Sequence, residues 1–89
     1  MVYLISYDLR APGRDYENLY RAIRSVADVE WCRPLESVYL IKSSKSANTI
    51  FQLLYQHIDK SDFLLVIEVT RNYSGYLAEE IVEYLSEMM

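Results

Sequence analysis

One aspartate, Asp8, ends a nearly continuous apolar segment in which a charge is unusual. Residues 2–9 read VYLISYDL, and aspartate is disfavoured inside strands. Arg10 and Arg14 follow closely. A carboxylate with arginines beside it is suited to a hard divalent cation and a phosphate group. The pattern therefore makes Asp8 a candidate metal ligand.

Two interpretations of Asp8 remain open. In the first, Asp8 ligates a metal ion, and a two-fold axis brings a second Asp8 from a partner chain to the same ion. In the second, Asp8 caps the following turn or forms an ion pair with Arg10 or Arg14. Residue patterning alone favours the second interpretation, since ordinary ion pairs also place charged groups together.

The elements that must position these residues alternate along the chain. Four strands are expected, over residues 2–9, about 29–33, 37–42 and 63–70, where β-branched, aromatic and aliphatic side chains are concentrated. Apolar residues at helical spacing follow Asp15, a predicted N-cap, and again follow Ser46 or Asn48. Residues 76–89 predict a third helix. The second and third strands are expected to break at residues 34–36, because a proline cannot sit in a central ladder.

The order β-α-β-β-α-β, with an added C-terminal helix, predicts one α+β domain over residues 1–89. Its expected form is a ferredoxin-like sandwich with a four-stranded antiparallel sheet. Right-handed crossovers would place the first and third strands in the centre, flanked by the fourth and second. One edge of that sheet would then gather Asp8, Glu36, Ser37 and Asp62. Asp62 is most simply a turn residue.

Both faces of the predicted sheet are apolar, although its two helices can cover only one. In the first strand Tyr3 and Ile5 point one way while Val2 and Leu4 point the other, and residues 63–70 repeat the pattern. A face in contact with water would alternate to polar residues. The C-terminal helix or a second copy of the chain must therefore cover it. We expect a homodimer, with the last helix buttressing its edge.

Composition narrows the classes of function. The chain has 89 residues, 52% of them hydrophobic, with nine tyrosines, which is more apolar surface than one core of this size hides. The net charge of −4 argues against a protein that mainly coats nucleic acid. However, residues 1–45 carry seven Lys/Arg against six Asp/Glu, and residues 46–89 carry two against seven. The alternative that the first half of the chain carries a local basic patch therefore remains.

The cysteine content and the lengths of the apolar segments predict the cellular location. Cys32 is alone, so an intrachain disulfide is excluded. The first residues lack the basic flank of a signal peptide, and no apolar run approaches the length that crosses a bilayer. We expect a cytoplasmic protein that does not associate with membranes.

The segments Ser6-Tyr7-Asp8-Leu9 and Ser37-Val38-Tyr39 resemble motifs of the CRISPR-associated protein 2 family, and more closely those of its SinR-like relatives. Members of that family begin with an apolar strand that ends in Tyr-Asp-aliphatic and carry a Ser-Val-aromatic segment at the start of a later strand. Trp31 followed by residues 35–40, and the strand and turn over residues 66–75, are similar to the SinR-like branch.

The resemblance implies a ferredoxin-like homodimer in which Asp8 is the catalytic residue and the ligand of Mg²⁺ or Mn²⁺ in a phosphodiesterase. The implied contacts to RNA or DNA are Arg10, Arg14, Ser37 and Tyr39. The family also implies two other functions: a non-catalytic homodimeric assembly or adaptor protein, which binds nucleic acid or a protein partner, and a toxin-like ribonuclease. The sequence departs from the family in its acidic balance and in the helix predicted over residues 76–89, where the family has a strand exchanged with the partner.

Overall fold

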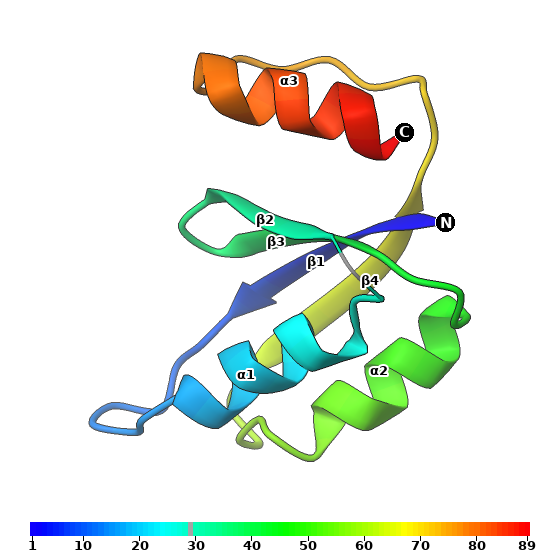
Figure 1. The fold of residues 1–89 in the computed structure, drawn as a ribbon. Helices are drawn as coiled ribbons and strands as arrows, with labels where there is room; N and C mark the ends of the chain where they lie inside the picture. The colour runs from blue at the N-terminus through cyan, green and yellow to red at the C-terminus, as the bar shows by residue number, and fades with distance from the viewer. Residues whose placement is uncertain (29) are drawn as a thin grey trace.

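The computed structural model describes residues 1–28 and 30–89, which form the three layers seen in Figure 1. One antiparallel sheet of four strands is the middle layer, built from β1 (Val2–Asp8), β2 (Trp31–Leu35), β3 (Val38–Lys42) and β4 (Phe63–Val69). The strand order is β2-β3-β1-β4, so β1 and β3 are central. The prediction of an α+β fold with a four-stranded antiparallel sheet is confirmed.

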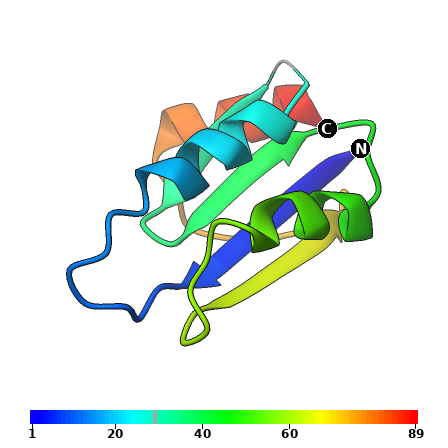
Figure 2. The ribbon, with the colours of Figure 1, turned by 90° about the horizontal axis from the view of Figure 1, so that it is seen from below.

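Helices cover both faces of this sheet. They are α1 (Glu17–Val26), α2 (Ala47–Tyr55) and α3 (Glu79–Met88). Figures 1 and 2 show α1 and α2 together on one face and α3 on the other. The third helix begins at Glu79, three residues after the start of the predicted range 76–89. Within the described residues, no helix is both long enough and apolar enough to cross a bilayer.

The predicted N-cap is present at the start of α2, whereas the N-cap of α1 lies one residue later than predicted. The Ser46 hydroxyl accepts a hydrogen bond of 3.1 Å from the backbone N–H of Thr49, as a side-chain cap of α2 should. At α1 the N-cap position is Tyr16 rather than Asp15. Asp15 still binds the first turn, because its Oδ1 accepts the Glu17 N–H at 2.9 Å.

The break predicted at residues 34–36 is wrong at its first two positions, since Pro34 and Leu35 belong to β2. The register shifts between Cys32, which pairs with Leu40, and Leu35, which pairs with Val38. β2 is an edge strand, and a proline at an irregular position of an edge strand needs no ladder hydrogen bond. The predicted strand start at residue 29 lies outside the described residues.

The larger core fills the space between the sheet and the first two helices. Its buried members from the strands and helices are Tyr3, Ile5, Tyr7, Leu19, Ile23, Val26, Tyr39, Ile41, Ile50 and Leu54. The three from β1 occupy alternate positions, as expected for one face of a strand. This core fixes the direction of β1 and therefore the position of Asp8 at its end.

A smaller core lies under α3 on the opposite face. It joins Leu85 and Met88 of α3 to Val2, Cys32 and Leu40 of the sheet. Burial raises the pKa of the Cys32 thiol, which behaves here as a small apolar side chain. The C-terminal helix thus covers part of the second face within its own chain.

The remainder of that face is open. The β1–β4 register pairs Asp8 with Phe63 and Ser6 with Leu65, so these side chains share the face that α3 only partly covers. Phe63 is 62% exposed and Leu65 is 54% exposed. We call the exposed group Asp8, Leu35, Phe63, Leu65 and Ile67 the open half-sheet.

We expect Leu85→Ala to lower the free energy of unfolding by about 3 kcal/mol, since truncation of a buried leucine leaves a cavity. Leu85 is 4% exposed, whereas Leu53 on α2 is 40% exposed. The matched control Leu53→Ala should cost less than about 1 kcal/mol. Urea denaturation followed by circular dichroism measures both. Equal losses in the two variants would contradict the packing of α3 against the sheet.

Candidate functional site

Asp8 lies at the sheet edge where β1 ends and where β3 and β4 begin. The backbone N–H of Tyr7 donates to the Ser37 carbonyl at 3.1 Å. The N–H of Arg10 donates to Asp62 Oδ1 at 2.7 Å. These bonds bring the β2–β3 turn and the start of β4 to the end of β1. The predicted gathering of Asp8, Ser37 and Asp62 at one edge is confirmed.

The Asp8 carboxylate is 55% exposed and forms an ion pair with Arg10. Arg10 Nε and Nη2 lie 2.9 and 2.7 Å from the same oxygen, Asp8 Oδ2. These hydrogen bonds and the adjacent charge raise the pKa of Arg10. Among the described residues, no donor contacts Oδ1. The ion pair of the second interpretation is therefore present, with Arg10 as the partner, but water and salt screen such an exposed pair.

Asp62 organises the backbone around this edge. Its oxygens accept the N–H of Arg10 and that of Asp59, each at 2.7 Å. The Tyr16 hydroxyl lies 2.7 and 2.8 Å from the two oxygens. Burial alone would raise the pKa of Asp62, but these donors outweigh it and hold the pKa below its ordinary value. Asp62 is thus a turn residue, as predicted, and it also ties the segment after β1 to the start of β4.

Arg14 lies away from Asp8. Its Nη1 is 3.4 Å from Asp59 Oδ1 and its Nη2 is 3.4 Å from the His57 carbonyl. The guanidinium carbon lies 5.4 Å from the centre of the Tyr16 ring. Arg14 therefore braces the turn between α2 and β4, and the structure does not bring it to the carboxylate that it follows in sequence.

Ser37 and Tyr39 have different environments. Ser37 is exposed in the turn between β2 and β3. Tyr39 is only 2% exposed, because it pairs with Ile5 on the face that α1 and α2 cover. Its ring packs against those of Tyr7, Tyr20 and Trp31. The ring of Tyr39, a predicted nucleic-acid contact, is therefore not accessible for stacking on a base in this chain.

Arg33 is the residue that sequence reasoning missed. Its guanidinium carbon lies 4.9 Å from the centre of the Tyr20 ring and 5.4 Å from that of Tyr39. Its Nε and Nη2 donate to the Glu36 carbonyl at 3.1 and 2.7 Å. The signal was the placement of Trp31 and Arg33 two residues apart on one strand.

Arg33 and Asp8 both line a recess of about 210 Å³. Its lining residues are Tyr7, Asp8, Leu9, Tyr20, Arg33, Glu36 and Ser37. Burial raises the pKa of Tyr7 to about 12, although the nearby Arg33 opposes the shift. Tyr7 therefore stays protonated and donates to the Glu36 carbonyl at 3.1 Å. The recess is polar, holds one arginine, and opens beside the candidate catalytic carboxylate.

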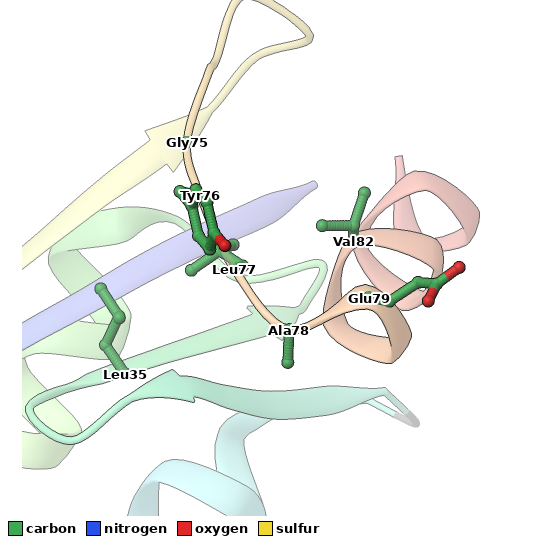
Figure 3. Close-up of a pocket in the computed structure, with 7 residues that line it drawn as sticks. All are labelled: Leu35, Gly75, Tyr76, Leu77, Ala78, Glu79 and Val82. Atoms are coloured by element: carbon green, nitrogen blue, oxygen red, sulfur yellow. The ribbon is translucent and has the colours of Figure 1, made fainter.

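Apolar hollows lie beside the open half-sheet. One of about 650 Å³ is lined by Leu35, residues 75–79 and Val82 (Figure 3). A second of about 290 Å³ shares Leu35 and residues 75–77 and extends to Leu4 and Val38. Their linings are mostly aliphatic and aromatic. Such surfaces suit the docking of a polypeptide better than they suit a catalytic site.

The residues available to a metal ion are few in one chain. Within residues 1–28 and 30–89, no three His, Cys, Asp or Glu side chains are placed to hold a metal together. The Asp8 side chain is half-exposed, and Arg10 contacts only its Oδ2. Mg²⁺ commonly takes one or two carboxylates and keeps several waters. Asp8 gives a single chain one such ligand at the end of β1, and Asp8 from a pair of chains would give two.

No protein-family model matches this chain, and no curated protein is significantly similar to it. The function must therefore be argued from the geometry of this edge.

We expect Asp62→Asn to lower the free energy of unfolding at pH 7 by about 2 kcal/mol, because the amide turns a donor toward backbone N–H groups that need an acceptor. The pKa of Asp62 is depressed in the folded chain, so its contribution is present above about pH 4 and is lost as the pH falls through the folded value. The stability curves of wild type and variant should therefore converge as the pH falls below about 4.

Denaturation in urea at a series of pH values measures this effect. Asp28→Asn is the matched control, since Asp28 is exposed and accepts one N–H, from Ser44. A gap between Asp62→Asn and wild type that stays constant down to pH 2 would contradict the assignment.

Proposed function

We propose that this chain is a metal-dependent nuclease of the CRISPR-associated protein 2-like type, a ferredoxin-like homodimer that hydrolyses phosphodiester bonds in the cytoplasm. An endoribonuclease-like activity is the expected form. The observation that carries the proposal is the position of Asp8, a half-exposed carboxylate at the end of a central strand and on the open half-sheet.

The open half-sheet supports the dimer. Phe63, Leu65 and Ile67 are large apolar side chains that α3 leaves exposed on one face. Burial of such side chains is favourable by roughly 25 cal/mol per Å² of apolar surface. A two-fold interface repeats the same residues from both chains. An interface built on Phe63 and Leu65 would therefore carry two copies of Asp8.

The chemistry of Asp8 fits a hard divalent ion under this arrangement. Asp8 Oδ1 is open to a ligand, and Arg10 holds only Oδ2. Two such carboxylates and water molecules match the oxygen ligands that Mg²⁺ and Mn²⁺ prefer. When bound, the ion polarises a phosphodiester and lowers the pKa of a water molecule. Arg10, displaced from Oδ2, would remain near the site to neutralise a phosphate, with the exposed Ser37 hydroxyl at its border.

We expect Asp8→Asn to reduce cleavage of single-stranded RNA in Mg²⁺ or Mn²⁺ on the order of a hundredfold or more, since the amide removes the charged metal ligand. Gel electrophoresis of end-labelled substrate measures the rate. Asp28→Asn, at an exposed position beside the opposite end of β3, should cleave like wild type. Cleavage that survives Asp8→Asn would come from a contaminating nuclease and would end the proposal.

We expect Leu65→Glu to convert the dimer to a monomer, weakening association at least about a hundredfold, because two carboxylates would meet in an apolar interface. Leu65 is exposed within one chain, so the monomer should keep its fold. Sedimentation velocity measures the oligomeric state. The control Leu53→Glu, on the outer layer formed by α2, should remain dimeric. A monomeric wild type would remove the basis for a shared metal site.

A second function has an observation in its favour. Asp8 is already paired with Arg10 in the single chain, which is the state expected if the carboxylate orders an interface instead of holding a metal. The chain would then be a non-catalytic homodimeric adaptor that binds nucleic acid or a protein partner. Dissociation of the dimer by Leu65→Glu, combined with no cleavage in any divalent cation, would favour the adaptor over the nuclease.

A further inference from the structure

The recess beside Arg33 also borders Asp8, but Arg33 gives it a chemistry that differs from that of the Asp8–Arg10 ion pair. Its lining brings Arg33 and Tyr20 together with Glu36 and Ser37. Arg33 comes from the edge strand β2, whereas Asp8 comes from the central strand β1. The two residues therefore line the same recess from different strands.

The guanidinium of Arg33 is held in place before any ligand arrives. The rings of Tyr20 and Tyr39 lie within 4.9 and 5.4 Å of it, and the Glu36 carbonyl accepts from Nε and Nη2. These two hydrogen bonds engage Nε and Nη2 and leave Nη1 out of the contact with this carbonyl. An arginine fixed in this way loses little side-chain entropy on binding and presents a planar donor suited to a phosphate.

Among the described residues that line the recess, Arg33 is the cation, and no carboxylate forms an ion pair with it. The carboxylate of Asp8 is paired with Arg10. The Glu36 carboxylate is the remaining negative group of the lining, and it is exposed to solvent. Ser37 and Tyr20 contribute hydroxyl groups, which can donate to an anion. A phosphate is therefore attracted by Arg33 and opposed by Glu36.

Trp31 extends this site along the strand. Its ring is 41% exposed and lies 5.8 Å from that of Tyr39. Arg24 lies 5.6 Å from the centre of the same ring. Exposed aromatic rings next to arginines are stacking platforms for the bases of single-stranded nucleic acid. An exposed ring that can stack on a base, beside a guanidinium that can bind a phosphate, suits a strand of nucleic acid.

We propose that Arg33 binds one phosphate of a single-stranded nucleic acid in this recess, while an adjoining base stacks on Trp31. The site would orient the strand across the end of β1 and deliver its neighbouring phosphodiester to Asp8. The proposal rests on the proposed function only in taking nucleic acid as the ligand, because binding at Arg33 requires neither a metal ion nor cleavage.

Fluorescence anisotropy of a labelled single-stranded RNA, in EDTA to prevent cleavage, tests the site. Arg33→Gln should weaken binding about tenfold or more, since a charge-assisted contact is lost. It should also lower the slope of log affinity against log salt by about one. Trp31→Ala should weaken binding about fivefold or more. Glu36→Gln should strengthen binding, because the opposing charge is removed.

Lys42→Gln is the matched control. Lys42 pairs with Val2 at the far end of β1, six residues from Asp8 and therefore about 20 Å away. It should change the affinity less than about twofold. Arg33→Lys keeps the charge without the planar fork, so it should bind more weakly than wild type and more tightly than Arg33→Gln. Thermal unfolding of each variant verifies that the fold is retained.

Equal losses in Arg33→Gln and Lys42→Gln would overturn the proposal, as would an unchanged Trp31→Ala or competition by inorganic phosphate at the same concentration as RNA. The outcome for the proposed nuclease is separable. Binding that depends on Arg33 without cleavage would uphold this site and reject the nuclease. Cleavage that depends on Asp8 but not on Arg33 would uphold the nuclease and reject this site.

Discussion

The strict alternation of β1, with apolar side chains on both faces, is the constraint on which the rest of the structure depends. Tyr3, Ile5 and Tyr7 enter the core beneath α1 and α2. The intervening positions start with Val2 under α3 and end with Asp8 on the open half-sheet. A strand of period two cannot move Asp8 without moving every core residue to the wrong face. The packing of the hydrophobic core therefore dictates the place of the candidate catalytic carboxylate.

The dimensions of α3 explain why the second face stays partly open. Its 10 residues span about 15 Å, and a helix is about 10 Å wide. The seven residues of β1 span about 23 Å, and four strands are about 19 Å across. One helix of this size cannot cover such a face. The uncovered part is the half that contains Asp8, Phe63 and Leu65. The apolar surface predicted from both faces of the sheet is thus divided between an intrachain contact and a surface open to a partner.

The sequence was sufficient for features that depend on local pattern. The strand order, the faces of β1 and β4, a cap of α2 at Ser46 or Asn48, and the gathering at one edge follow from periodicity and connection rules. Features that depend on tertiary partners were not predictable in this way. The sequence predicts a break at Pro34, whereas the register shift that accommodates this proline in β2 arises from pairing with β3. Tyr39 resembles an accessible motif residue, but its register opposite Ile5 buries it. Arg14 follows Asp8 in sequence, yet the turn after α2 supplies its partner.

Coverage of the open half-sheet would also change the electrostatics of Asp8. In the single chain, water screens the pair that it forms with Arg10. Association through Phe63 would exclude that water, and two nearby carboxylates would repel one another unless cations compensated them. The two compensating groups at hand are the Arg10 side chains, which already lie over the Phe63 rings, and a divalent ion. A dimer that kept Arg10 on Asp8 would have no metal ligand and would match the proposed adaptor. A dimer that exchanged Arg10 for a divalent ion would gain a Lewis acid and leave two guanidinium groups for phosphate. Competition between Arg10 and the cation for Asp8 is therefore the interaction that separates the two functions.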